Sequence, residues 1–461
     1  MSARAPNNPV ATPRPHAFVG RFAHAPSIDR LEILDDAFVG VDAGGTITTV
    51  GRADDPVHAP AIDAARRAGT LVRTDGARFF LPGLVDLHVH APQWPQLGRA
   101  LHLPLRDWLA EVTFPLERRY ADLDFADRVY RSLVATLLAE GTTTAVYFAT
   151  LHEPATHRLA ELCVELGQRA LVGRVAMDNP EECPADYRDA SADVALAGTE
   201  ALIANVARIP GNESGRVLPA ITPRFAPSCT DALLDGLGDL AARHGCHVQT
   251  HCSESAWEHG FVAARFGRSD TRALDGFGLL TRRSVLAHCT HASDADLSIM
   301  AARGTGVAHC PLSNAWFSDA VFPLRRALGL GVRVGLGTDV SGGPDASLLS
   351  AARHAMVASR LLGRGTDARE AMRGTGDAGI DFAEALHLAT AGGADALELP
   401  VGRFRVGCRF DALLIDPDAP GGGVVRFEGL EDAAELVQKC VHGATRANVA
   451  GVWTDGRRRG G

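Results

Sequence analysis

Two histidines, His88 and His90, stand one residue apart at the end of a short apolar segment, Leu84–His90, which follows the turn signal Pro82-Gly83. In a β-strand, side chains at positions i and i+2 point to the same face. The two imidazoles are therefore expected about 6–7 Å apart along one face, from where both can reach one metal ion. Two histidines on a surface loop are the alternative, and a His-x-His pattern alone favours that alternative.

Further residues of the types that bind metals or transfer protons lie far downstream: His251, Glu254, His288 and Asp339. A set made of His88, His90, His251 and Asp339 mixes nitrogen and oxygen donors, which suits Zn²⁺, with Fe²⁺ possible. A divalent ion lowers the pKa of a bound water from about 16 to about 7 and so supplies hydroxide at neutral pH. This set predicts a hydrolytic site with one open position for water.

Three of these residues are candidates for catalysis. Glu254 follows His251 by three residues, so it can reach the same cavity and act as a general acid and base. His288 can hold the hydroxide or stabilise a developing alkoxide, and Asp339 can both bind metal and hydrogen-bond the attacking water. Structural alternatives exist for two of them: Asp339 can be a plain turn or N-cap residue, and Glu254 can be a solvated carboxylate. For His309, a structural role and a place in the site are both open.

The chain alternates β-rich and helical segments over its central part. Helical stretches include Phe125–Ala139 and Asp231–His244, and Gly245 after the latter is a predicted C-cap. Eight β/α units predict an α/β fold with a (β/α)₈ TIM-type barrel, whose catalytic groups lie at the C-terminal ends of the strands, where the candidate residues fall. The predicted strands are Phe80–His90, Thr143–Thr150, Ala170–Asp178, Val217–Phe225, His247–Glu254, Ser284–His288, Gly306–Cys310 and Val332–Asp339.

The two ends of the chain have a different character. Residues 1–16 are rich in proline, alanine and asparagine and are predicted to form a disordered tail. Short β-like pieces separated by glycine and aspartate turns recur in residues 17–78 and again in 400–461. Chain ends often lie close together, so these two regions predict one small flanking β-sandwich domain beside the barrel of residues 79–399.

Composition excludes several classes of function. The chain has 461 residues, a net charge of −9 and a pI of about 6.0, and its only basic run is Arg457–Arg459, so a nucleic-acid partner is disfavoured. Met1–Pro15 has no apolar core of a signal peptide, and no uncharged apolar run reaches membrane-spanning length. Nine cysteines without a Cys-x-x-Cys motif predict free thiols and a cytoplasmic location.

Several motifs resemble the amidohydrolase superfamily and, more closely, its guanine deaminases. The resemblance covers nearly the whole chain from Phe18 to about Val452. Gln93, the segment Leu103–Phe114 and Thr222–Phe225 are its most specific parts. The motifs that carry it are Pro82–Gln93, Leu103–Leu109 with Thr113–Pro115, Gly141–Thr150, Thr222–Phe225 with Ser228-Cys229, His251–Glu254, Ala308–Pro311 with Ser313-Asn314, Gly335–Val340 and Phe410–Asp416.

The resemblance implies hydrolysis of guanine to xanthine and ammonia by a zinc-dependent enzyme, usually a homodimer. It makes Glu254 the proton shuttle and His288 a catalytic histidine beside the metal. It implies one metal per chain, because relatives with two metals use a lysine after the fourth strand and the only lysine here is Lys439. The implied metal ligands are His88, His90, His251 and Asp339, and the implied substrate-binding residues are Gln93, Arg224 and Phe225, together with His90, His251, Glu254 and Asp339.

Three regions depart from the pattern, namely Trp316, the loop Gly211–Gly215 and the long stretch Gly363–Gly379. A second substrate class stays open: another amino-heterocycle such as a modified guanine, a pterin or a triazine. Gln93 and Arg224 are the features that discriminate between these substrates. A barrel without catalysis, acting as a binding protein, is disfavoured because all predicted metal and shuttle residues are present. The His-x-Glu…Pro-Cys-x-x-Cys signature of the other zinc base deaminases is missing.

Overall fold

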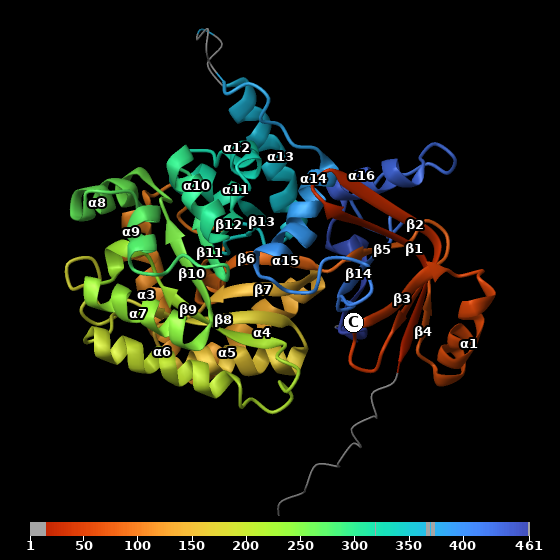
Figure 1. Cartoon of the computed structure of the whole chain (residues 1–461), viewed down its shortest axis with the longest axis horizontal. Helices are drawn as coiled ribbons and strands as arrows, with labels where there is room; N and C mark the ends of the chain where they lie inside the picture. Colours follow the sequence, from red (N-terminus) through yellow and green to blue (C-terminus); the bar gives the residue numbers. More distant parts are fainter. Residues whose placement is uncertain (1–14, 319, 366–368, 370–373, 460–461) are drawn as a thin grey trace, which may run out of the picture.

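The computed structural model describes residues 15–318, 320–365, 369 and 374–459. Figure 1 shows a large barrel ringed by helices and, beside it, a smaller sheet that carries a helix of its own. The expected N-terminal tail lies outside the described residues except for its end, since strand β1 begins at His16. The predicted α/β barrel with a flanking β region built from both chain ends is confirmed.

Eight parallel strands form the barrel, each paired with the next along the chain. The last strand returns to the first through hydrogen bonds from His90 N to Val340 O at 2.7 Å and from Asp339 N to His88 O at 2.8 Å. The strands are β6 (Leu84–His90), β7 (Thr142–Phe148), β8 (Arg169–Ala176), β9 (Val217–Pro223), β10 (His247–Cys252), β11 (Ser284–His288), β12 (Gly306–His309) and β13 (Arg333–Leu336).

The barrel strands are long apolar runs because helices cover the outside and side chains fill the inside. Every residue of β6, β7 and β8 is buried. Inside the barrel, Val85, Val146 and Ala308 belong to one apolar cluster that helix α15 (Gly393–Ala396) closes. The outer helices include α4 (Leu123–Ala139), α5 (Glu153–Leu166), α6 (Ala192–Val206), α7 (Asp231–His244), α8 (Ala256–Phe266), α9 (Asp270–Gly276), α10 (Asp294–Arg303), α12 (Leu324–Gly329), α13 (Leu348–Arg364) and α14 (Phe382–His387).

Helix α7 follows its sequence signals at both ends. The side chain of Thr230 accepts a hydrogen bond from Leu233 N and caps the N-terminus. Gly245 ends the helix in the left-handed conformation, with φ 59°, which glycine adopts at low cost. The predicted helix and its C-cap are therefore confirmed.

The second sheet joins the two ends of the chain. Its interior is aromatic: Phe18 stacks on Phe410 with 3.8 Å between ring centroids, and Trp453 meets Phe18 edge-on. Helix α1 (Ala59–Ala68) packs on this sheet, and α16 (Ala433–Gly443) packs against α13 and α14. The strands are β1 (His16–Ser27), β2 (Arg30–Val41), β3 (Ile47–Arg52), β4 (Leu71–Arg73), β5 (Phe79–Pro82), β14 (Ala412–Ile415), β15 (Val449–Thr454) and β16 (Arg457–Arg459).

The predicted strand Phe80–His90 is split by Gly83 into β5, which pairs with β14 in the small sheet, and β6 of the barrel. Gly83 N donates a hydrogen bond to Asp411 O, and a Cβ at Gly83 would lie 2.0 Å from Thr143 Oγ1. Glycine is thus required where the chain passes from one sheet to the other. The domain limits at residues 79 and 400 stay predictions.

Within the described residues, no helix combines the length and apolar character needed to cross a bilayer. All nine cysteines are free. Of the long stretch Gly363–Gly379, residues 366–368 and 370–373 lie outside the described residues.

Candidate metal and catalytic site

The four predicted metal ligands meet at the C-terminal end of the barrel. The Nε2 atoms of His90 and His251 lie 3.0 Å apart, and Asp339 Oδ1 lies 3.2 Å from His88 Nε2 and 3.5 Å from His90 Nε2. Donor atoms about 2.0–2.1 Å from a tetrahedral Zn²⁺ are about 3.3 Å from one another. His88, His90 and His251 form one buried group that could hold a metal ion, and His88 forms a second with His288 and Asp339, which follows the eighth strand.

The protonation of the histidines fits the same ion. Burial lowers the pKa of His88, His90 and His251 well below the ordinary value, so all three imidazoles are neutral at neutral pH. His251 Nδ1 donates a 2.6 Å hydrogen bond to Arg224 O, which leaves the lone pair of Nε2 directed into the cluster. His88 Nε2 makes no hydrogen bond within the described residues although it is buried. Buried acceptors of this kind are costly unless a ligand meets them.

Asp339 is held in place by a carboxylate that the sequence motifs did not single out. Asp339 itself adopts the left-handed conformation, with φ 51°. Asp86 accepts hydrogen bonds from Thr338 Oγ1 at 2.6 Å, from Thr338 N at 3.0 Å and from His88 N at 3.2 Å. Asp86 therefore joins the strand ends that carry His88 and Asp339. A charged residue inside the otherwise apolar strand Leu84–His90 is the sequence signal for it.

Glu254 and His288 lie on the other side of the cluster. His288 Nδ1 donates to Asn314 Oδ1 at 2.9 Å, so its Nε2 faces Glu254 Oε2 at 3.7 Å and Asp339 Oδ2 at 3.9 Å. Burial, together with the charge of Asp339, raises the pKa of Glu254 well above its usual value. Burial also raises the pKa of Asp339 to about 6, against the opposing effect of His288. A buried carboxyl group whose pKa is raised in this way can take up a proton in one step and return it in the next.

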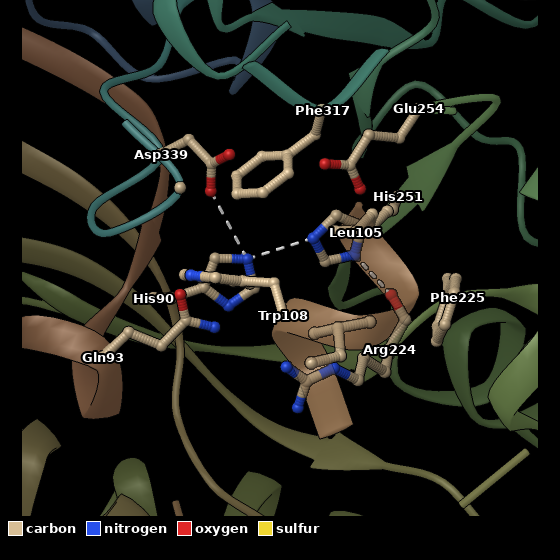
Figure 2. A pocket seen from close by; sticks show the side chains of 12 residues that line it. His90, Gln93, Leu105, Trp108, Arg224, Phe225, His251, Glu254, Phe317 and Asp339 are labelled. Carbon is tan, nitrogen blue, oxygen red and sulfur yellow. Dashed lines mark hydrogen bonds and ion pairs between the residues drawn. The ribbon is translucent and has the colours of Figure 1, made fainter. Parts of the chain in front are cut away.

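A pocket lined by both polar and apolar side chains opens beside this cluster. Figure 2 shows the carboxylates of Asp339 and Glu254 on one side of it and Gln93 and Arg224 on the other. Apolar walls come from helix α2 (Leu105–Trp108), from Phe225 after β9 and from Phe317 in η6 (Asn314–Ser318). The rings of Trp108 and Phe317 lie 5.0 Å apart. Apolar and aromatic walls beside a few polar groups are the usual lining of a site for a flat heterocycle.

The predicted substrate-binding residues share a partner that the sequence gave no reason to expect. Glu117, at the end of α3 (Phe114–Glu117), forms a two-pronged ion pair with Arg224, at 2.7 and 3.1 Å. The same carboxylate accepts from Gln93 Nε2 at 3.2 Å and from Tyr187 Oη at 2.8 Å. Glu117 follows the motif Thr113–Pro115 by two residues, and nothing in its spacing links it to Arg224.

His309 stays outside the cluster. It is buried at the end of β12 with its ring 5.3 Å from that of Phe322, and burial lowers its pKa to about 3. It belongs to none of the described groups of side chains that could hold a metal ion. This placement favours the structural alternative for His309.

Comparison with known proteins agrees with the motifs. The model of the Amidohydrolase family matches residues 79–459. The probable guanine deaminase of Schizosaccharomyces pombe is 39% identical over 95% of this chain and 82% of its own length, and the human guanine deaminase is 34% identical over 97% of both chains. The crystal structure of guanine deaminase from C. acetobutylicum with guanine bound is 28% identical, with a TM-score of 0.85 over 97% of this chain and all of that one. This chain belongs to the amidohydrolase family and, within it, to the guanine deaminases.

Proposed function

We propose that this protein catalyses the hydrolytic deamination of guanine to xanthine and ammonia, with Zn²⁺ held by His88, His90, His251 and Asp339. The observation that carries the proposal is the buried cluster of three histidines and Asp339, which lies beside Glu254 in a pocket that Gln93 and Arg224 also line. When bound, the ion lowers the pKa of water to about 7 and so supplies the nucleophile. The nitrogen and oxygen donors favour Zn²⁺, with Fe²⁺ as the alternative.

Glu254 performs the proton transfers. Water adds across the C2=N3 bond of guanine, and Glu254 carries one water proton to N3. It then carries the proton of the new C2 hydroxyl to the leaving amino group as the C2–N bond breaks. The raised pKa of Glu254 supports this role, because the group must accept a proton in one step and release it in the next.

His288 and Asp339 position the attacking water. The Nε2 atom of His288 lies between the carboxylates of Glu254 and Asp339, so a water there can be held by all three groups. Asn314 keeps His288 in the orientation that this contact needs. Removal of the imidazole would leave the water without one of its partners but would spare the four predicted ligands.

Gln93, Arg224 and Phe225 select the base. With C2 beside Glu254, the O6 and N7 edge of guanine faces away from the cluster and toward Arg224. Arg224 spends two of its five N–H groups on Glu117, so three remain for these acceptors. Adenine offers a donor amino group at the same position and is rejected. Phe225 packs on the ring face.

An ammonia-release assay on a purine panel tests the function. Purified protein loaded with Zn²⁺ should deaminate guanine, and adenine should be poorer by about 10⁴-fold, the discrimination reached by sites that hydrogen-bond a substrate group. Faster release from a pterin, a triazine or a modified guanine would replace the substrate. No release from any of them would overturn the proposal. A homodimer and a cytoplasmic location remain predictions, which light scattering and cell fractionation can check.

A further inference from the structure

We propose that Glu117 is the positioning residue that sets base specificity: its carboxylate fixes Gln93 and Arg224 together, so that the pocket presents only N–H groups of Arg224 to the base and carries no net charge beside it. The inference rests on the proposed function, because it concerns how that same pocket chooses its base. Glu117 touches neither the predicted metal ligands nor Glu254 in any described contact.

The carboxylate of Glu117 is fully used by four donors. Oε1 accepts from Gln93 Nε2 and from one terminal nitrogen of Arg224. Oε2 accepts from the other terminal nitrogen of Arg224 and from Tyr187 Oη. A carboxylate offers about four lone-pair positions, so all of them are filled. Glu117 has 0% of its surface exposed, and such a saturated buried group has one orientation.

The saturated carboxylate fixes which atoms face the base. The amide of Gln93 cannot turn over, because Nε2 is bound by Glu117 and Oε1 accepts a 3.4 Å hydrogen bond from Ser341 N. Arg224 cannot rotate, because both terminal nitrogens are held and its guanidinium lies 5.0 Å from the ring centroid of Phe114. The remaining N–H groups of Arg224 therefore match a ring edge with two adjacent acceptors.

Glu117 also balances the charge of Arg224. Burial disfavours the charged guanidinium, yet Glu117 keeps the pKa of Arg224 above its ordinary value. The ion pair has no net charge, so its Coulomb attraction for an anion is small. A neutral base with carbonyl and ring-nitrogen acceptors is the ligand class that suits this arrangement.

The segment that carries Glu117 covers the pocket as well. Helix α2, the π-helical segment η3 (Leu109–Thr113) and α3 run continuously from Leu105 to Glu117, and Leu105, Trp108 and Leu109 line the pocket. Arg224 follows β9, and Tyr187 lies between β8 and α6. Glu117 thus ties the cover of the pocket to the barrel residues that read the base.

Replacement of Glu117 by glutamine separates positioning from general structure. The amide nitrogen of Glu117→Gln would face Arg224 donor to donor, so the guanidinium must rotate. KM for guanine should rise about 10–100-fold, the effect of a lost charged hydrogen bond, while kcat stays within about threefold and metal content is unchanged. Urate, an anionic purine, should become a stronger competitive inhibitor, because the positive charge of Arg224 is no longer balanced. Opposite shifts for guanine and urate cannot arise from loosening alone.

Tyr187→Phe is the matched control. It removes one donor from Glu117 and keeps the three hydrogen bonds to Gln93 and Arg224, so KM and urate inhibition should stay within about threefold of wild type. If Glu117→Gln does not fold, the double variant Glu117→Gln with Arg224→Gln, which removes both charges, replaces it. KM of that double variant should lie within about threefold of KM of Arg224→Gln alone, since Glu117 then has no guanidinium to position and keeps only its neutral hydrogen bond with Gln93.

Each outcome decides the inference. The inference is overturned if Glu117→Gln leaves both KM for guanine and inhibition by urate unchanged. It is also overturned if only kcat falls, or if guanine and urate are weakened equally. None of these results contradicts guanine deamination itself. If wild-type protein does not deaminate guanine, the proposed function fails. Glu117 is then tested by calorimetric binding of the base that the panel favours, and equal binding by wild type and Glu117→Gln, or no binding of any base, overturns the inference too.

Discussion

The two ends of the barrel both gather buried carboxylates, but they treat them in opposite ways. At the N-terminal end, Asp455 accepts hydrogen bonds from Arg169 at 2.8 Å, Arg216 at 2.8 Å and Arg409 at 2.6 Å. Asp411 accepts from Arg169 at 3.0 Å and from Asp455 N at 2.8 Å. This cluster joins strands of the barrel to turns of the small sheet.

The C-terminal end holds carboxylates without matching cations. Burial opposes the ionisation of Asp455, yet its three arginines lower its pKa to about 2. Burial raises the pKa of Asp339 to about 6 instead, because no lysine or arginine pairs with it among the described residues. Buried carboxylates are thus matched by arginines at the N-terminal end, and Asp339 is left without one at the end where we propose that a metal is bound and a proton transferred.

The ion pair of Glu117 with Arg224 shows that role, not position, makes this difference. It lies at the C-terminal end but is matched and bidentate like the pairs of the N-terminal cluster. Neither Glu117 nor Arg224 takes up or releases a proton in the proposed mechanism. They hold donors in place, which requires a fixed charge balance.

Metal removal should have the largest effect, because it leaves the unbalanced end without its cation. Dialysis against a chelator is expected to abolish ammonia release, and one equivalent of Zn²⁺ per chain should restore it. Elemental analysis checks the stoichiometry. Full activity without metal, or a requirement for two ions per chain, would contradict the predicted ligand set.

Glu254→Gln should remove activity at no cost in stability. We expect turnover to fall about 10²–10⁴-fold, the usual contribution of a positioned general acid and base. The free energy of unfolding should stay level or rise, because the variant removes a buried carboxyl group that forms no ion pair with a lysine or arginine within the described part of the chain. Steady-state kinetics, elemental analysis and urea unfolding measure the three quantities. Near-full turnover would assign the proton transfers to another group such as His288.

Asp455→Asn should show the reverse pattern. Loss of the carboxylate leaves Arg169, Arg216 and Arg409 underpaired in a buried cluster, which is expected to cost about 3–5 kcal/mol of unfolding free energy. The turnover of the folded protein should remain within about twofold of wild type, since the cluster touches no pocket residue. A kcat that falls in step with stability would show that the two ends are coupled.

Most candidate site residues at the C-terminal end of the barrel could be predicted from the sequence, because the barrel topology determines where strand ends lie. Parallel strands place their C-terminal residues on one rim, so His88, His251 and Asp339 meet although more than 250 residues separate the first from the last. Strand ends were right to within a few residues. The turn signal at Pro82-Gly83 was recognised, but not that it divides the predicted strand Phe80–His90 between two sheets, because that division depends on Asp411 O, an acceptor far along the chain.

The supporting residues were harder to predict. Glu117, Asn314 and Asp86 act through partners whose closeness only the folded chain reveals; Glu117 and Arg224, for example, are 107 residues apart. Single polar residues of this kind carry no periodic pattern. The small sheet was predictable as a β region at both chain ends, but not its pairing order or the charge cluster beneath it, because neither is encoded in local spacing.

Acid should lower the free energy of unfolding by protonating Asp455 in the N-terminal cluster. The pKa of Asp455 is lowered from its usual 3.8 to about 2 in the folded protein, so its contribution to stability is fully present above pH 4 and is lost as pH falls toward 2. A shift of this size corresponds to about 2 kcal/mol. Urea unfolding at a series of pH values should therefore show a loss of that order between pH 4 and pH 2, on top of the loss from other carboxylates. Asp455→Asn is the control, because it lacks the titrating group and its pH dependence should be shallower by the same amount. Equal slopes for both proteins would mean that Asp455 titrates normally and that the arginines around it are not what balances this end of the barrel.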